Sequence, residues 1–126
     1  MKRQIVATDA APKAVGPYSQ AVWAGDVLFC AGQIPLEPAT GNVVPGGITE
    51  QATRVLENIK GLLKSQGLGF GNVVKSTVYL SDMNNFGAMN DVYAKYFTKE
   101  PPARSTVQVA RLPKDALVEI EIVAAR

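Results

Sequence analysis

The chain has 126 residues, of which 47% are hydrophobic, and its 13 basic and 11 acidic residues give a formal net charge of +2 at pH 7. This size and composition predict one compact domain spanning residues 1–126. The chain has no histidine and one cysteine, which excludes Ser-His-Asp and Cys-His catalysis, zinc sites of His and Cys ligands, and intrachain disulfides. Its small net charge, without a basic run, predicts no nucleic-acid or membrane partner.

The N-terminus carries Lys2 and Arg3, but no apolar region of signal-peptide length follows, and no segment approaches membrane-spanning length. We therefore expect a cytoplasmic protein, and a single cysteine fits a reducing compartment. No cofactor-binding motif is visible, so we expect neither a cofactor nor a metal.

The first predicted elements are two strands joined by a tight turn. Ser19–Ala24 and Val27–Ala31 flank Gly25-Asp26, a two-residue loop in which glycine can adopt the positive φ that a hairpin demands. The segment 34–47 is rich in Pro and Gly, which predicts a loop with at most one short extended piece.

A long amphipathic helix is predicted after this loop, with Thr49 as a candidate N-cap and Gly67 as its C-terminal glycine. Gly67, Gly69 and Gly71 follow a helix and lead into a strand, whereas a dinucleotide-binding loop has the opposite order. The apolar residues at helical spacing are Ile48, Ala52, Val55, Leu56, Ile59, Leu62 and Leu63.

Alternation from Val74 to Leu80 predicts a strand that ends at Ser81-Asp82. A second helix is expected to begin there, with Ser81 or Asp82 as its cap and Pro101-Pro102 as its stop. Its apolar residues, at the spacing of a core-facing stripe, are Phe86, Met89, Val92, Tyr93, Tyr96 and Phe97.

The stretch from Pro102 to Glu121 alternates polar and apolar residues on both sides of a turn, which predicts two more strands. If their apolar faces join one core, Arg104 and Glu119 lie together on the other face of the same sheet. The polar residues of that face are Arg104, Thr106 and Gln108 from the first strand and Glu119 and Glu121 from the second.

The order of elements predicts an α+β domain with a mixed, mainly antiparallel sheet and both helices on one face. Its other face is then either in contact with water or covered by another copy of the chain. A guanidinium and a carboxylate on adjacent strands there could bind and process a small charged molecule. The alternative is a solvated face with ordinary surface charges.

Two other residues are singled out by their surroundings in the sequence. Tyr18 follows Gly16-Pro17, a rigid dipeptide that would place its hydroxyl, and both a site role and an edge role are open for it. Cys30 lies inside an apolar strand, where a buried, inert thiol is the usual occupant.

Three sequence blocks carry a family resemblance. They are Gly16-Pro17-Tyr18-Ser19-Gln20, Gly32-Gln33-Ile34-Pro35, and the stretch from Pro102-Ala103-Arg104-Ser105 through Leu112-Pro113-Lys114-Asp115 to Glu119-Ile120-Glu121. Together they resemble the Rid family, the reactive intermediate deaminases formerly called YjgF proteins, over nearly the whole chain. Because the family arginine is present as Arg104, the chain resembles the catalytically competent RidA branch.

The resemblance implies a chorismate-mutase-like α+β fold and a homotrimer with three clefts between subunits. It also implies hydrolysis of 2-imino acids, tautomers of 2-enamino acids such as 2-aminoacrylate, to 2-keto acids and ammonia. Carried onto this sequence, Arg104 would hold the substrate carboxylate and Glu119 would position or deprotonate the attacking water. Tyr18 would line the cleft with its hydroxyl.

The resemblance also implies four substrate-binding positions. Asn90 and Thr106 match positions near the family site more loosely, and the backbone around Gly32 should supply hydrogen bonds to the ligand. Ala31 stands where the family commonly has serine, so a mechanism that requires that hydroxyl is not expected here. A mechanism that uses Glu119 and water is unaffected.

Two alternatives to a hydrolase remain at this stage. The same cleft could hold a keto or imino acid without turnover, as a regulatory module, and Glu119 discriminates because turnover needs it whereas carboxylate binding mainly needs Arg104. RNA cleavage has also been attached to the family, but the near-neutral charge and the absence of histidine argue against it.

Overall fold

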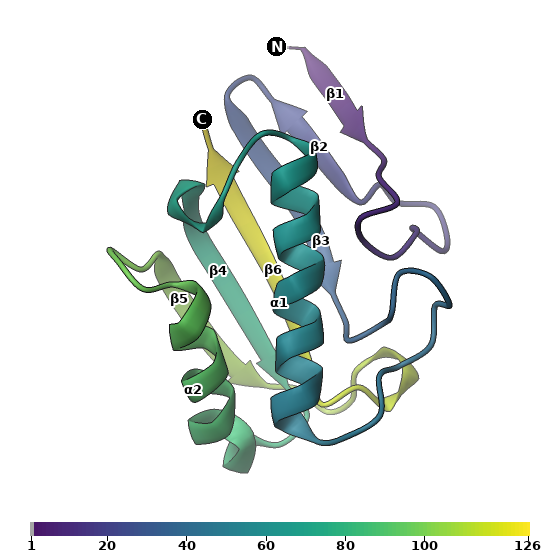
Figure 1. Ribbon diagram of the computed structural model, residues 1–126, viewed down its shortest axis with the longest axis vertical. Coiled ribbons are helices and arrows are strands. Elements are labelled where there is room, and N and C mark those ends of the chain that lie inside the picture. The colour runs from purple at the N-terminus through teal and green to yellow at the C-terminus, as the bar shows by residue number, and fades with distance from the viewer. Residues whose placement is uncertain (1) are drawn as a thin grey trace.

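The computed structural model describes residues 2–126, which form a six-stranded sheet with two α-helices packed on one face (Figure 1). The strand order is β1-β2-β3-β6-β4-β5, and only the β4–β5 pair is parallel. The expected α+β class and mainly antiparallel sheet are confirmed. The strands are β1 (Arg3–Val6), β2 (Ala21–Ala24), β3 (Val27–Gln33), β4 (Val73–Leu80), β5 (Ala103–Gln108) and β6 (Val118–Ala125).

Local sequence signals predicted the hairpin of β2 and β3 correctly but did not predict the edge strand β1. Gly25 has a φ of +61° between β2 and β3, as the hairpin prediction requires. β2 begins two residues later than predicted, because Gln20 lies in the loop before it and bonds to that loop. β1 was not predicted, since only Val6 of its four residues is buried and it pairs with β2 alone, at the edge of the sheet.

Helix α1 (Ile48–Ser65) has a different N-cap from the predicted one. Gly47 is the N-cap, and its N–H donates to Glu50 Oε1 at 2.7 Å, so Thr49 lies inside the first turn. At the other end Gly67 has a φ of +73°, and its N–H donates to the carbonyl of Lys64. The expected helix-ending glycine is therefore confirmed.

Helix α2 (Phe86–Tyr96) follows a 3₁₀ turn (Met83–Asn85) rather than starting directly after β4. Asp82 caps this turn, because its carboxylate accepts the N–H of Asn84 at 2.9 Å. Among residues 2–126, no helix is long and apolar enough to cross a membrane.

The core lies between the two helices and one face of the sheet, with α1 and α2 in front of the strands in Figure 1. Leu56, Ile59 and Leu62 of α1 are fully buried against it. From the sheet, fully buried side chains at alternate positions are Leu28, Ser76, Val78, Leu80, Val118 and Ile120. The opposite face, with Glu119 and Glu121, is not covered by either helix; we call it the open face.

Strand β5 presents the opposite face from the predicted one. Arg104 pairs with Ser76 and Thr106 pairs with Val78, so both lie on the helix side of the sheet. Val107 pairs with Tyr79 and is 42% exposed on the open face. Because β5 is an edge strand, its inward positions lie at the margin of the core beside α2, where long polar side chains can still reach solvent.

Candidate functional site

A bulge in β3 brings Glu119 against the backbone of Gly32. Cys30 pairs with Ile122 and Gln33 with Ile120, so two β3 residues, Ala31 and Gly32, face Glu121 alone, and Glu119 lies two residues along β6. A Cβ atom on Gly32 would lie 2.8 Å from Glu119 Cδ and closer still to Oε2. Only glycine leaves room for the carboxylate in this position.

Four of the predicted site residues, Tyr18, Ala31, Gly32 and Glu119, line one cavity of about 640 Å³. The cavity is bounded by the loop before β2, the loop after β3 and the turn before β6. Its wall is mainly aliphatic, and two lysines contribute to it. The other lining residues include Pro12, Lys13, Val15, Ile34, Leu36, Pro38 and Lys114.

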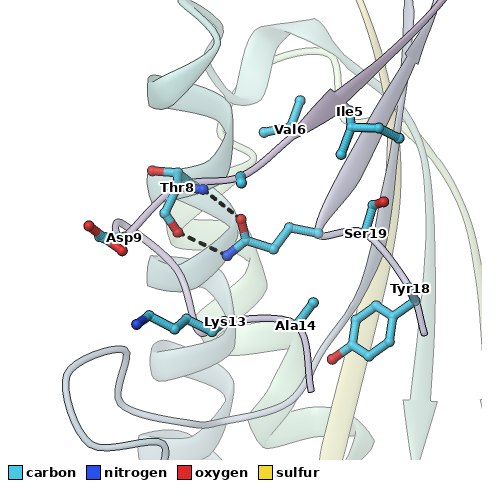
Figure 2. Close-up of a pocket in the computed structure, with 10 residues that line it drawn as sticks. Ile5, Val6, Thr8, Asp9, Lys13, Ala14, Tyr18 and Ser19 are labelled. Atoms are coloured by element: carbon cyan, nitrogen blue, oxygen red, sulfur yellow. Dashed lines mark hydrogen bonds between the residues drawn. The ribbon is translucent and has the colours of Figure 1, made fainter. Parts of the chain in front are cut away.

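Tyr18 lies on a loop anchored by the amide of Gln20. The Gln20 side chain accepts the N–H of Thr8 at 2.7 Å and donates to its carbonyl at 2.9 Å, as the dashed lines in Figure 2 mark. The Tyr18 hydroxyl accepts the Val15 N–H at 3.2 Å, and the side chain is 53% exposed. Tyr18 also borders a neighbouring hollow of about 440 Å³ that Asp9 helps to line (Figure 2).

Glu119 is a half-buried carboxylate at the wall of this cavity. Partial burial and, to a lesser extent, the negative charge of Glu121 raise the pKa of its carboxyl group. Within residues 2–126, no side chain or backbone group donates a hydrogen bond to this carboxylate. Its oxygens are therefore free to bind water or substrate.

Arg104 forms the centre of a second cluster, with Asn90. Its Nη1 donates to Asn90 Oδ1 at 2.8 Å, and its guanidinium lies 4.8 Å from the ring centroid of Tyr93 and 5.6 Å from that of Phe86. In the described part of the chain no carboxylate pairs with it. Thr106, two residues along β5, has a buried Oγ1 with no hydrogen-bond partner among these residues. Arg104 therefore has further N–H groups with which it could bind an anionic ligand.

The seven predicted site residues thus fall into two groups, and the expectation that Arg104 and Glu119 share one sheet face within a chain is wrong. Arg104, Asn90 and Thr106 lie on the helix side at the β5 edge, whereas Glu119 extends from the open face into the cavity. Sequence reasoning also missed Phe86 and Tyr93 as neighbours of Arg104, because their helical spacing indicated core packing.

Cys30 lies outside both groups in the role expected for it. It is 6% exposed, and burial raises the pKa of its thiol to about 12, which opposes formation of a thiolate. Among residues 2–126, the His, Cys, Asp and Glu side chains form no group of three that could hold a metal ion.

The fold and these groups define a small α+β domain with the Glu119 carboxylate in a cavity and, on the other face of the sheet at its β5 edge, an arginine that pairs with no carboxylate among residues 2–126. The sequence model of the family described as "Endoribonuclease L-PSP" matches residues 8–126. The chain therefore belongs to this family, which is also known as the YjgF or Rid family.

Known relatives are similar over most of their length. A RutC family protein of Pyrococcus horikoshii is 54% identical over 97% of both chains. A protein of Capra hircus named 2-iminobutanoate/2-iminopropanoate deaminase is 51% identical over 97% of this chain and 89% of its own. The crystal structure of E. coli TdcF with bound serine has a TM-score of 0.93 and 44% identity, covering 98% of both chains.

Proposed function

We propose that the protein is a hydrolase that converts 2-imino acids, and their 2-enamino tautomers such as 2-aminoacrylate, to 2-keto acids and ammonia. We also propose that it works as a homotrimer whose sites lie between subunits. The observation that carries this proposal is that Arg104 and Glu119, neither of which has an ionic partner among residues 2–126, lie on opposite faces of the sheet. An interface between copies can bring the Arg104 of one subunit to the Glu119 of the next.

Arg104 is suited to hold the substrate carboxylate. A guanidinium can donate two parallel hydrogen bonds to a carboxylate, and Asn90 occupies only one of its nitrogens. The Tyr93 and Phe86 rings beside it limit how far the guanidinium can turn. Substrate is thereby oriented before it reacts, which is the main contribution that so small a site can make.

Glu119 is suited to activate water. As the water oxygen bonds to the imine carbon, Glu119 takes one proton from the water and passes it to the imine nitrogen, which gives a neutral carbinolamine. Glu119 then takes the proton of the carbinolamine hydroxyl and delivers it to the amino group, so that breaking the C–N bond releases ammonia and leaves the keto acid. The step needs no oxidant or reductant, and water is the only co-reactant.

The remaining predicted residues have supporting roles in this proposal. Gly32 offers backbone groups close to the Glu119 carboxylate, and Tyr18 and Ala31 line the same cavity. Because an imine already hydrolyses in water, each tenfold acceleration requires only about 1.4 kcal/mol of barrier reduction. Holding the substrate carboxylate with Arg104 and activating water with Glu119 are therefore enough for a useful rate.

The names of the relatives support this choice of reaction. The Capra hircus relative is named as a deaminase of 2-iminobutanoate and 2-iminopropanoate, and the TdcF structure holds serine, a small amino acid. The archaeal relative carries only the RutC family name. The family description refers to an endoribonuclease, but a chain with no histidine and a net charge of +2 offers little for RNA cleavage.

The test is to generate the imine in place with an amino acid oxidase and follow its disappearance with wild-type protein, with Glu119→Gln and without protein. We expect acceleration by the wild type and a loss of about 10²–10⁴-fold in Glu119→Gln. If the wild type only matches the protein-free rate while calorimetry detects binding of pyruvate, the protein is a binding module. Hydrolysis by Glu119→Gln at the wild-type rate would remove Glu119 from the mechanism.

A further inference from the structure

Three side chains share the open face of the sheet, and one of them, Glu119, lines the cavity. Tyr79 of β4 stands directly opposite Glu119 of β6 in the strand register. Glu121, two residues along β6, extends from the same face as Glu119. The Tyr79 hydroxyl does not bond to the residue opposite it but reaches diagonally and donates to Glu121 Oε1.

We propose that Glu121, held in place by the Tyr79 hydroxyl, is a positioning residue that orients and electrostatically tunes Glu119 as the base of the hydrolysis. This inference rests on the proposed function for its catalytic consequence. Its structural content, a fixed negative charge beside Glu119, can be measured without turnover.

The hydrogen bond determines where the charge of Glu121 lies. An ionised carboxylate is the better acceptor for a phenol, and this bond to Glu121, with some burial, raises the pKa of Tyr79 to about 12. Tyr79 therefore remains a donor across the physiological pH range. Without it, Glu121 on an exposed sheet face would be free to turn toward solvent, where its effect on Glu119 would be screened.

The same bond leaves Glu119 unoccupied. Tyr79 is the hydroxyl nearest to Glu119 in the register, and because it is engaged by Glu121, the Glu119 oxygens remain available to water and substrate. Gly32, on the other side of Glu119, has no side chain that could donate to it. The arrangement thus places the negative charge of Glu121 near Glu119 while the Glu119 oxygens remain available as hydrogen-bond acceptors.

Other charged or titratable groups also face this region. From β4, Lys75 lines the same small hollow as Glu121 and donates to Ser105 Oγ at 3.2 Å. Across the cavity, Lys114 donates to the Gly41 carbonyl at 3.1 Å, and Lys13 and Tyr18 lie on the loop before β2. Apart from burial, the charge of Glu121 is the influence that raises the pKa of Glu119. A carboxylate that binds a proton more strongly is a better general base near neutral pH.

The experiment compares Glu121→Gln and Tyr79→Phe with the wild type. Each removes one member of the pair with little change in shape. The control is Tyr96→Phe, because Tyr96 donates an analogous hydrogen bond to Glu57, at 2.7 Å, between the two helices. Equal far-UV circular dichroism and equal oligomeric mass establish that each variant is folded.

The first readout is the ¹³C chemical shift of the Glu119 carboxyl group as a function of pH, assigned by its loss in Glu119→Gln. We expect the Glu119 titration to move to lower pH in Glu121→Gln, to move less far in Tyr79→Phe, and to stay unchanged in Tyr96→Phe. An unchanged Glu119 titration in folded Glu121→Gln overturns the inference.

The second readout is the acidic limb of the kcat/KM profile for imine hydrolysis. We expect it to move to lower pH together with the NMR titration, with a decrease of less than about tenfold on the plateau because the base has become weaker. A limb that stays in place while the NMR titration moves overturns the catalytic part of the inference. A wild type that does not hydrolyse the imine overturns the proposed function instead, and the NMR result is independent of it.

Discussion

Arg104 and Glu119 lie on opposite faces of the same sheet. Arg104 pairs with Ser76 on the helix-covered face, whereas Glu119 pairs with Tyr79 on the open face. The strands that carry them, β5 and β6, are also separated by β4, so one chain cannot hold a small substrate between these two groups. A site that uses both requires a second subunit to supply one of them.

Replacing Arg104 by lysine tests the proposed carboxylate contact. A single ammonium cannot reproduce two parallel hydrogen bonds or the packing over Tyr93, so we expect kcat/KM to fall roughly 10- to 100-fold. The matched control is Arg126→Lys, because Arg126 also stacks on an aromatic ring, that of Trp23, but lies outside both clusters. Equal losses in the two variants would show a general effect on the fold rather than a contact with substrate.

The alternating pattern of β5 predicts which residues share a face, but it does not predict which side of the sheet that face takes. Alternation correctly predicts that Arg104 and Thr106 share a face, but the side that this face takes depends on where β5 joins the sheet. β5 pairs parallel with β4 at the edge, beside α2, and this arrangement is set by contacts distant in sequence. The hairpin at Gly25-Asp26 and helix α1 depend on local signals, and both were predicted correctly.

Tyr18, Gly32 and Glu119, named as site residues with the help of the family resemblance, line one cavity, and their roles stay a prediction. Tyr79 and Glu121 were missed because their hydrogen bond depends on the register between β4 and β6, two strands more than 30 residues apart in the sequence. No single segment contains that information.

Glu119 should destabilise the native state at neutral pH. Its pKa is raised on folding by burial and by Glu121, so the folded protein binds the proton more tightly than the unfolded chain does. The stability associated with the protonated form is present below the unfolded pKa of about 4.3 and is lost as the pH rises through the folded pKa. We expect Glu119→Gln to raise the free energy of unfolding at pH 7 while abolishing most of the activity.

Urea unfolding at one fixed protein concentration measures this effect, because subunit association also contributes to stability. The advantage of Glu119→Gln over the wild type should shrink as the pH is lowered to about 3.5, where a glutamate is protonated in both states. A variant that is less stable than the wild type at pH 7 would contradict the raised pKa of Glu119.

Gly32→Ala tests the close approach of Glu119 to the backbone. The added Cβ would lie 2.8 Å from Glu119 Cδ, so the carboxylate must move out of its position. We expect most of the activity to be lost, since a displacement of about 1 Å in a reacting group can cost ~10²-fold in rate. Gly71→Ala is the control, because a Cβ there meets nothing within 4 Å. Full activity in Gly32→Ala would show that Glu119 does not act from this position.

The proposed trimer is tested most sharply by mixing two variants of low activity. Light scattering should first report about three times the chain mass of 13.4 kDa. Arg104→Lys and Glu119→Gln are then unfolded together in equal amounts and refolded. If each site takes Arg104 from one subunit and Glu119 from its neighbour, about one quarter of the sites contain both native residues, since each is present with a probability of about one half.

Activity should therefore return to about one quarter of that of wild-type protein carried through the same unfolding and refolding. Each variant refolded alone is the baseline, because it contains no site with both residues. If instead both groups came from one chain, no mixed site would be complete, and the mixture would stay at this baseline. Recovery above it thus requires that the two faces of the sheet, one from each of two subunits, form the site together.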